Sequence, residues 1–176
     1  MLLRKVNAWL SLLITIMVLN HAIFNAVWML SMGAVENIVS NVSLMMMILM
    51  VIHAVISIAL ANSGRKGAEK RKSREYKKLN AQTFVQRISG GAMLLFTALH
   101  VAGTLGIMQP PDLVHAIVPP LFFAIVLAHV AVSTDKALIT LGFGSARFIK
   151  IMGIATKVLC AVTLVADVVG FYLYVC

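Results

Sequence analysis

The sequence predicts an all-α integral membrane protein, built as a bundle of five transmembrane helices with the N-terminus in the cytoplasm. Hydrophobic residues make up 61% of the 176 residues and charged residues 12%, whereas an average soluble domain is about 45–50% apolar and about 25% charged. A soluble chain of this length has too little interior to bury so much apolar surface. The composition therefore argues against a soluble enzyme, a disordered chain and a secreted disulfide scaffold.

Long windows without charge locate the helices. Four such windows are each long enough for a helix of about 20 residues to cross a membrane, and a fifth apolar segment contains only Lys157 and Asp167 as charged residues. The first window follows Arg4 and Lys5 as a signal peptide would, but it is too long for one, so we expect an uncleaved helix. The expected helices are 6–30, 40–61, 84–108, 113–133 and 148–175, in a single transmembrane domain over residues 1–176.

The distribution of charge predicts the orientation. Fifteen Lys and Arg against six Asp and Glu give a net charge of +9, and eight of the basic residues lie in the expected loop 62–83. Because basic loops stay on the cytoplasmic side, this loop and the N-terminus are expected inside, leaving only Glu36 and Asp112 outside. The chain is thus expected in the cell (inner) membrane. The basic loop serves as a topology signal, contacts lipid headgroups or docks a cytoplasmic partner, and nothing indicates nucleic acid.

Four of the five histidines lie inside four successive predicted spans: His21, His53, His100 and His129. Ionisable residues inside a membrane are costly and indicate function. With about 1.5 Å of rise per residue, His21 lies about 22 Å and His100 about 24 Å from the inner ends of their helices. His53 and His129 lie only about 8 and about 5 residues from theirs. The sequence therefore predicts two levels, with His21 and His100 farther out and His53 and His129 farther in.

Each of these histidines lies on a stripe of small and polar residues that repeat in steps of three and four along the helix. In a membrane, such residues face other helices rather than lipid. The stripes include Asn7, Ser11, Thr15 and Asn25 with His21, Ser43 and Ser57 with His53, Gly90 and Thr97 with His100, and Ser133 with His129. Ordinary helix packing explains such stripes, but a histidine in each favours a site. Two facing imidazoles supply both axial ligands of a haem iron, whereas a zinc site takes three or four ligands together. Two levels predict two haems.

The sequence resembles a known family. Residues 80–90, NAQTFVQRISG, followed by LFTALH at 95–100, resemble the Q-R-x-S/T-G…H helix of the membrane cytochrome b subunit of succinate dehydrogenases and fumarate reductases. The run HAIFN at 21–25 resembles the H-x-x-x-N of that family's first helix, and His53-Ala54 and Ala128-His129 resemble its second and fourth helices. The resemblance implies five helices, with haem ligands on helices 1 and 3 for one haem and on helices 2 and 4 for the other.

The same resemblance implies a di-haem membrane anchor of a succinate:quinone oxidoreductase or quinol:fumarate reductase. Such a subunit binds two haem b groups and carries electrons between membrane quinone (menaquinone or ubiquinone) and a cytoplasmic iron–sulfur subunit. That subunit joins an FAD flavoprotein, where succinate and fumarate interconvert, so this chain would hold no dicarboxylate catalytic site.

Further polar residues flank the histidine stripes. Arg87 and Ser89, at the inner mouth of the third helix, are candidates for a haem propionate clamp or a quinone contact. His115, with Pro119 and Pro120, marks the outer end of the fourth helix and is a candidate quinone contact. Because two haems are useful mainly when electrons cross the membrane, we favour the outer position for quinone.

Two alternatives stay open. Cytochrome b anchors of nitrate reductases and formate dehydrogenases also use paired histidines, but they need one on the fifth helix, where this chain has none. A haem-free small transport or assembly protein would use the histidines for packing or for a proton path.

In the fifth helix, Lys157 is expected to snorkel inward, and Asp167, which has no obvious partner on its own helix, is a candidate for a proton relay.

Overall fold

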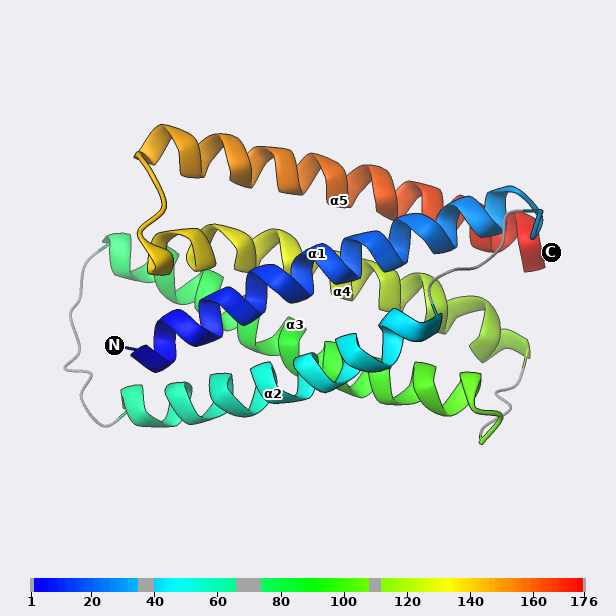
Figure 1. Cartoon of the computed structure of the whole chain (residues 1–176), viewed down its shortest axis with the longest axis horizontal. Helices are drawn as coiled ribbons and strands as arrows, with labels where there is room; N and C mark the ends of the chain where they lie inside the picture. The colour runs from blue at the N-terminus through cyan, green and yellow to red at the C-terminus, as the bar shows by residue number, and fades with distance from the viewer. Residues whose placement is uncertain (1, 35–39, 66–73, 108–111, 176) are drawn as a thin grey trace.

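The computed structural model describes residues 2–34, 40–65, 74–107 and 112–175, without the side chains of 40–42, 63–65, 74–82, 104, 112–116 and 175. Its elements are five helices: α1 (Leu2–Leu30), α2 (Ser40–Arg65), α3 (Arg74–Thr104), α4 (Asp112–Leu141) and α5 (Ala146–Val175) (Figure 1). Each helix contains a segment long and apolar enough to cross a membrane. The expected all-α bundle of five spanning helices is confirmed, and the chain is a multi-pass membrane protein.

The helices extend beyond the apolar segments at the polar ends. α3 begins at Arg74, inside the expected loop 62–83, and α4 continues to Leu141 rather than ending at 133. Backbone hydrogen bonds hold a helix whatever its side chains, and the added turns of α4 find polar partners on neighbouring helices. Charge-free windows therefore locate the membrane-crossing part of a helix and miss its polar continuation.

Glycines in the left-handed conformation end two helices. Gly106 (φ 71°) follows α3 and Gly142 (φ 76°) follows α4. After each, a backbone N–H reaches back over a turn, with Ile107 N 2.9 Å from Ala102 O and Phe143 N 3.1 Å from Leu138 O. This is the usual termination of a helix by glycine, and it ends α3 at Thr104 rather than at 108.

α1 and α4 form the centre of the bundle. α1 packs against α2, α4 and α5, and α4 packs against α1, α3 and α5. In the described part of the chain, α2 and α3 form no comparable pair with each other, so they flank the centre as outer helices (Figure 1). Only 6% of the apolar segments of α2 and α3 is buried, against 28% in α1 and 33% in α4.

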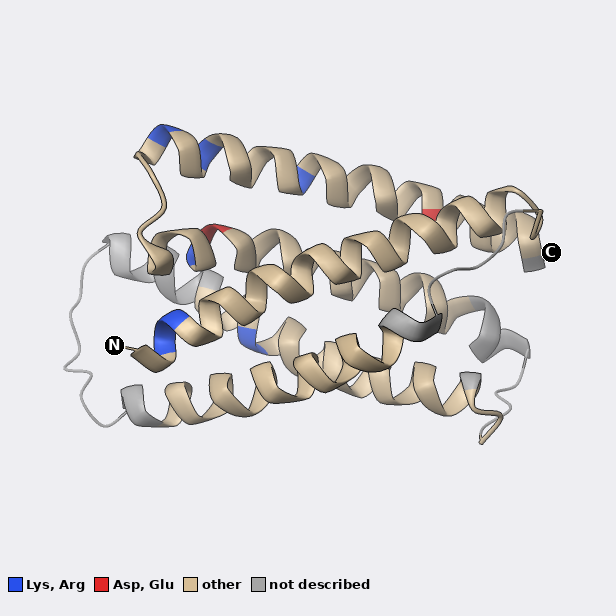
Figure 2. Cartoon of the chain, viewed as in Figure 1, with Lys and Arg blue, Asp and Glu red and all other residues tan. Residues whose placement is uncertain are grey.

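The two ends of the bundle differ in charge. Described Lys and Arg residues gather toward the end that holds the N-terminus, which we call the basic end (Figure 2). The opposite end, which holds the C-terminus, we call the far end. Glu36 and the basic residues 66–72 of the α2–α3 connection lie outside the described residues. Which end faces the cytoplasm is not fixed by the fold.

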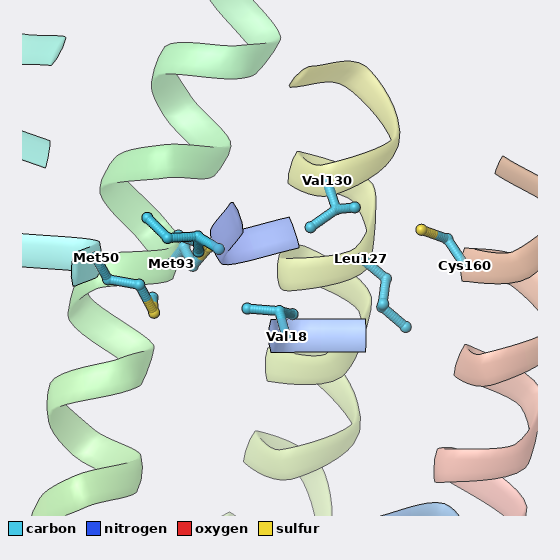
Figure 3. Packing of buried hydrophobic residues seen from close by; sticks show 7 residues of the cluster. Val18, Met50, Met93, Leu127, Val130 and Cys160 are labelled. Atoms are coloured by element: carbon cyan, nitrogen blue, oxygen red, sulfur yellow. The ribbon is translucent and has the colours of Figure 1, made fainter. Parts of the chain in front are cut away.

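An apolar cluster joins all five helices at mid-bundle. It consists of Ile14, Val18, Met50, Met93, Leu127, Val130 and Cys160 (Figure 3). On α1 and α3, the cluster residues lie nearer to the basic end than His21 and His100, and on α2 Met50 lies farther from it than His53. On α4, Leu127 lies farther from the basic end than His129, whereas Val130 is the next residue toward that end. The cluster therefore separates two polar levels with a packed apolar layer.

Small residues allow α5 to approach its neighbours closely. A Cβ added at Gly153 would overlap the carboxylate of Asp135 on α4, and one added at Gly170 would lie 3.2 Å from Met29 Cβ on α1. The contact at Gly153 affects an ion pair, because Asp135 Oδ2 lies 2.8 Å from Lys157 Nζ. The Gly153 backbone thus leaves room for an ion pair between α4 and α5.

We expect Gly153→Leu to destabilise the bundle by about 1–3 kcal/mol, the usual cost of overpacking. The new side chain must displace Asp135 from Lys157 and separate α4 from α5. The thermal midpoint of the purified protein in detergent measures this loss. Gly91→Leu is the matched control, because no atom lies within 4 Å of a Cβ added there. An equal loss in both variants would contradict the proposed importance of the α4–α5 contact.

Candidate functional site

The far pair of histidines, His21 on α1 and His100 on α3, lies toward the far end. His21 Nδ1 is 3.4 Å from Ser43 Oγ on α2, and Asn25 Nδ2 donates a 2.9 Å hydrogen bond to the His21 carbonyl. His100 is exposed, and its ring packs against Phe122 on α4 with 5.4 Å between ring centroids. The two imidazoles are close enough to interact electrostatically.

The near pair, His53 on α2 and His129 on α4, lies toward the basic end, and its members also interact electrostatically. His53 Nε2 is 3.5 Å from Ser57 Oγ, which exchanges hydrogen bonds of 3.1 and 3.3 Å with the Asn7 amide. His129 Nδ1 is 2.9 Å from Ser89 Oγ on α3. The histidines that interact electrostatically are those that the depth along each helix groups together, while their role as ligands stays a prediction.

Ser89 fixes the tautomer of His129. The Ser89 hydroxyl donates to the Gln86 carbonyl at 3.3 Å, so its one proton is already used. Its oxygen must then accept a proton from His129 Nδ1. The lone pair of His129 therefore resides on Nε2. In metal-binding histidines, a hydrogen bond to one ring nitrogen typically determines that the other nitrogen is free to bind the metal.

Gly90 provides the space that His129 occupies. A Cβ added at Gly90 would lie 3.1 Å from His129 Cε1 and 3.6 Å from His129 Nδ1. Any larger residue would push the imidazole away from Ser89. The neighbouring Ser89 and Gly90 of α3 thus position His129 together, the first by a hydrogen bond and the second by its missing side chain.

Two buried polar atoms on the outer helices have no hydrogen-bond partner among the described residues: His53 Nδ1 on α2 and Thr97 Oγ1 on α3. Buried polar atoms in native proteins are nearly always bonded, so an orphan needs an explanation. Both atoms belong to the predicted stripes, on the two helices that are least buried in the bundle. A bound group between α2 and α3 would account for both features.

A polar network ties α3 to α4 near the basic end. Lys136 Nζ donates to Gln86 Oε1 at 2.8 Å and to Thr83 Oγ1 at 3.0 Å, and Gln86 Nε2 lies 3.4 Å from Ser133 Oγ. The sequence indicates two of these residues, Ser133 by its stripe and Gln86 by the Q-R motif. Lys136 lies beyond the predicted end of the fourth helix at 133, so the sequence provides no reason to expect this contact.

Lys157 has a partner for its charge. Its Nζ pairs with Asp135 on α4 at 2.8 Å, and the Asp135 carboxylate lies beside Gly153, about one turn nearer to the basic end. The pairing partner lies on another helix and beyond the predicted end of that helix. The sequence of α5 by itself could not supply it.

An apolar groove of about 430 Å³ lies between α3 and α4. Its lining residues are Phe84, Val85, Ile88, Ser89, Ala92, Ala124, Ile125 and Ala128. Ser89 supplies a hydroxyl, and that hydroxyl also contacts His129 of the near pair. The three alanines leave the space that larger side chains would fill. The groove therefore combines an apolar wall with one polar group next to an imidazole.

The remaining residues that the sequence singles out are Arg87, Pro119, Pro120 and His115. Arg87 is exposed and interacts electrostatically with Lys136. Pro119 and Pro120 lie inside α4, which continues through both. The His115 side chain lies outside the described residues. In the described part of the chain, no three or more His, Cys, Asp or Glu side chains gather as one metal site, so each histidine level offers two imidazoles.

Comparison of the chain with protein-family models, with characterised proteins and with solved structures gives no match. The class that the fold defines is a multi-pass membrane protein of five helices. Within that class, the paired histidines and the groove are the features that bear on function.

We expect the His129 ring to adopt the Nδ1–H form in wild type and to lose this preference in Ser89→Ala. The lost hydrogen bond is worth about 0.5–1.5 kcal/mol. Nitrogen-15 NMR of labelled histidine side chains measures the tautomer, with His129→Gln identifying the signal. Ser31→Ala is the control, because within the described part of the chain Ser31 Oγ bonds to the Trp28 carbonyl at 3.0 Å and to no histidine. A wild-type His129 ring in the Nε2–H form would contradict the geometry.

Proposed function

We propose that the chain is the di-haem cytochrome b membrane anchor of a succinate:quinone oxidoreductase or quinol:fumarate reductase. The observation that carries the proposal is the electrostatic interaction of four intramembrane histidines, from four helices, as two pairs. Each pair would supply the two imidazoles that hold one haem iron. The motif resemblance of α3 supports the same assignment.

The residues present fit such a group. His21 and His100 would hold one haem and His53 and His129 the other. Gly90 leaves room beside His129, and the orphaned His53 Nδ1 and Thr97 Oγ1 lie on helices that the bundle covers poorly. A haem iron with two imidazole ligands supplies one-electron transfer.

The protein's own side chains prepare these positions. Ser89 holds His129 with its Nε2 lone pair free, and Ser43 contacts His21 through the same ring atom, Nδ1. Phe122 packs against His100 and restricts its ring. The mid-bundle cluster keeps water from the space between the two levels. The chain thus orients the proposed haem ligands and excludes water. It also places the two histidine pairs one after the other along the bundle.

The groove between α3 and α4 supports a quinone position near the basic end. It is apolar enough for a lipid-soluble carrier, and it lies beside Ser89, which contacts His129 of the near pair. Its volume of about 430 Å³ falls within the range of about 300–1,000 Å³ common for ligand sites. The alternative position is the far end of α4, with His115, Pro119 and Pro120.

The basic end supports docking of the iron–sulfur and FAD flavoprotein subunits. Arg4, Lys5, Arg147 and Lys150 are exposed there, and the basic residues of 66–72 add charge. A positive surface steers an acidic partner and also matches anionic lipid headgroups. Docking at this end implies that the N-terminus faces the cytoplasm.

The first test is haem content. We expect about two b-type haems per chain in a reduced-minus-oxidised spectrum of the purified protein. His21→Ala and His100→Ala should each remove the same spectral component, because each leaves one ligand of the far pair. His53→Ala and His129→Ala should remove the other component.

Asn20→Ala is the control for these variants, because Asn20 is exposed beside His21 and, among the described residues, its amide bonds to the Ile16 carbonyl of its own helix at 2.8 Å. Loss of one component by both His21→Ala and His53→Ala would contradict the pairing. A folded wild-type protein that contains no haem when grown with sufficient iron would leave the histidines a packing or proton-transfer role.

The second test is filling of the groove. We expect Ala124→Phe to raise the apparent KM for quinone at least about tenfold in the assembled complex, equivalent to about 1.4 kcal/mol of lost binding, with both haems retained. Ala98→Phe, on an exposed face of α3 outside the groove, should leave the KM unchanged. Equal kinetics in both variants would move the quinone position to the far end of α4.

A further inference from the structure

Asp167 is a fully buried carboxyl group without a partner. Its exposed fraction is 0%, and neither Oδ1 nor Oδ2 accepts a hydrogen bond from any described residue. It lies on α5, the helix that carries no histidine. The paired histidines therefore give Asp167 no role, and its burial needs a separate explanation.

The nearest charges along the bundle are already paired. Lys157, ten residues earlier on α5, binds Asp135 on α4 at 2.8 Å. Ten residues of helix span about 15 Å, so this ion pair lies too far from Asp167 to compensate it. Because α4 and α5 run antiparallel, moving ten residues toward the far end leads from Lys157 to Asp167 on α5 and from Asp135 to Ile125 on α4. Asp167 thus lies at an apolar level of α4.

The titratable groups on the helices packed against α5 point elsewhere. α5 packs against α1 and α4. His21 on α1 contacts Ser43 of α2, and His129 on α4 contacts Ser89 of α3. On α5 itself, Cys160 packs in the mid-bundle cluster about two turns away. None of these described groups compensates a charge at Asp167.

Close packing covers Asp167 toward the far end. One turn farther along α5, Gly170 allows such close approach that an added Cβ would lie 3.2 Å from Met29 Cβ and 3.5 Å from the Ala26 carbonyl. Phe171 is also buried there, with 6% exposed. The carboxyl is therefore accessible only to a very small ligand, and along α5 it lies much closer to Val175 at the far end than to Ala146.

The chemistry of an isolated carboxyl identifies that ligand. An ionised carboxylate with neither a cation nor a hydrogen-bond donor is far more costly in apolar surroundings than the neutral acid. A hard metal cation takes several oxygen ligands, and no group of three or more described His, Cys, Asp or Glu side chains gathers at Asp167. A proton needs just one oxygen, so it is the ligand that fits.

We propose that Asp167 is a proton-binding site in the α1–α4–α5 interface, which holds a neutral carboxylic acid at rest and exchanges its proton with water. In this step the O–H bond breaks, the electron pair stays on the carboxylate, and the proton passes to a water molecule. No electron is transferred and no other reactant is required. The site does not depend on haem, because it involves none of the four paired histidines.

Infrared difference spectroscopy of the full-length protein in lipid vesicles tests the proposal. At neutral pH, wild type should show a carboxylic acid C=O band that is lost completely in Asp167→Asn. The control is the double variant Asp135→Asn/Lys157→Met, which removes the other described intramembrane carboxyl together with its cation. It should retain the band. Transfer of the wild-type protein to D2O should shift the band, because the proton exchanges with water.

Each other result overturns the proposal. Absence of the band in wild type at neutral pH would show a carboxylate. A band that disappears in Na⁺ or K⁺ but persists in choline at equal ionic strength would show an alkali-cation site. A band that never shifts in D2O, in protein whose surface amides have exchanged, would show a locked structural acid rather than an exchange site.

Discussion

The hydrocarbon interior of a membrane offers polar groups no hydrogen-bond partner, and the arrangement of this bundle depends on that constraint. Polar side chains must find partners on neighbouring helices, and most do. Ser89 and His129 join α3 to α4, Asn7 and Ser57 join α1 to α2, and Lys157 with Asp135 joins α4 to α5. The few buried atoms left over, such as those of His53 and Asp167, are therefore informative.

The bundle has a tightly packed side and an open side. α1, α4 and α5 pack closely, with glycines at the contacts and one neutral layer of apolar residues at mid-height. α2 and α3 are attached to this core by one neighbour each and stay poorly buried. The predicted haem ligands span both sides, two on central helices and two on the open ones. A bound group between them would complete packing that protein side chains leave unfinished.

The two proposals use these sides differently. Histidine pairs at two levels, each joining a central helix to an outer one, suit electron transfer across the bundle, and the groove beside Ser89 suits a lipid-soluble carrier. On the packed side, Asp167 has no partner and suits a proton. Electrons and protons need different surroundings: an electron carrier needs fixed ligands and excluded water, while a proton site needs one titratable oxygen. In the proposed arrangement, the five helices provide these surroundings in separate places.

The sequence by itself determined the five spanning helices, because charge-free windows of sufficient length are a direct consequence of the membrane's apolar interior. It also determined the depth of each histidine, since the rise per residue is fixed. Only the tertiary structure decided what depends on neighbours across helices: the Ser89 contact that sets the His129 tautomer, the space at Gly90, the Lys157–Asp135 pair and the isolation of Asp167. Helical periodicity gives a residue its height and its face, but its partner depends on how a second helix is rotated and shifted against it, and that is set by side-chain packing throughout the bundle.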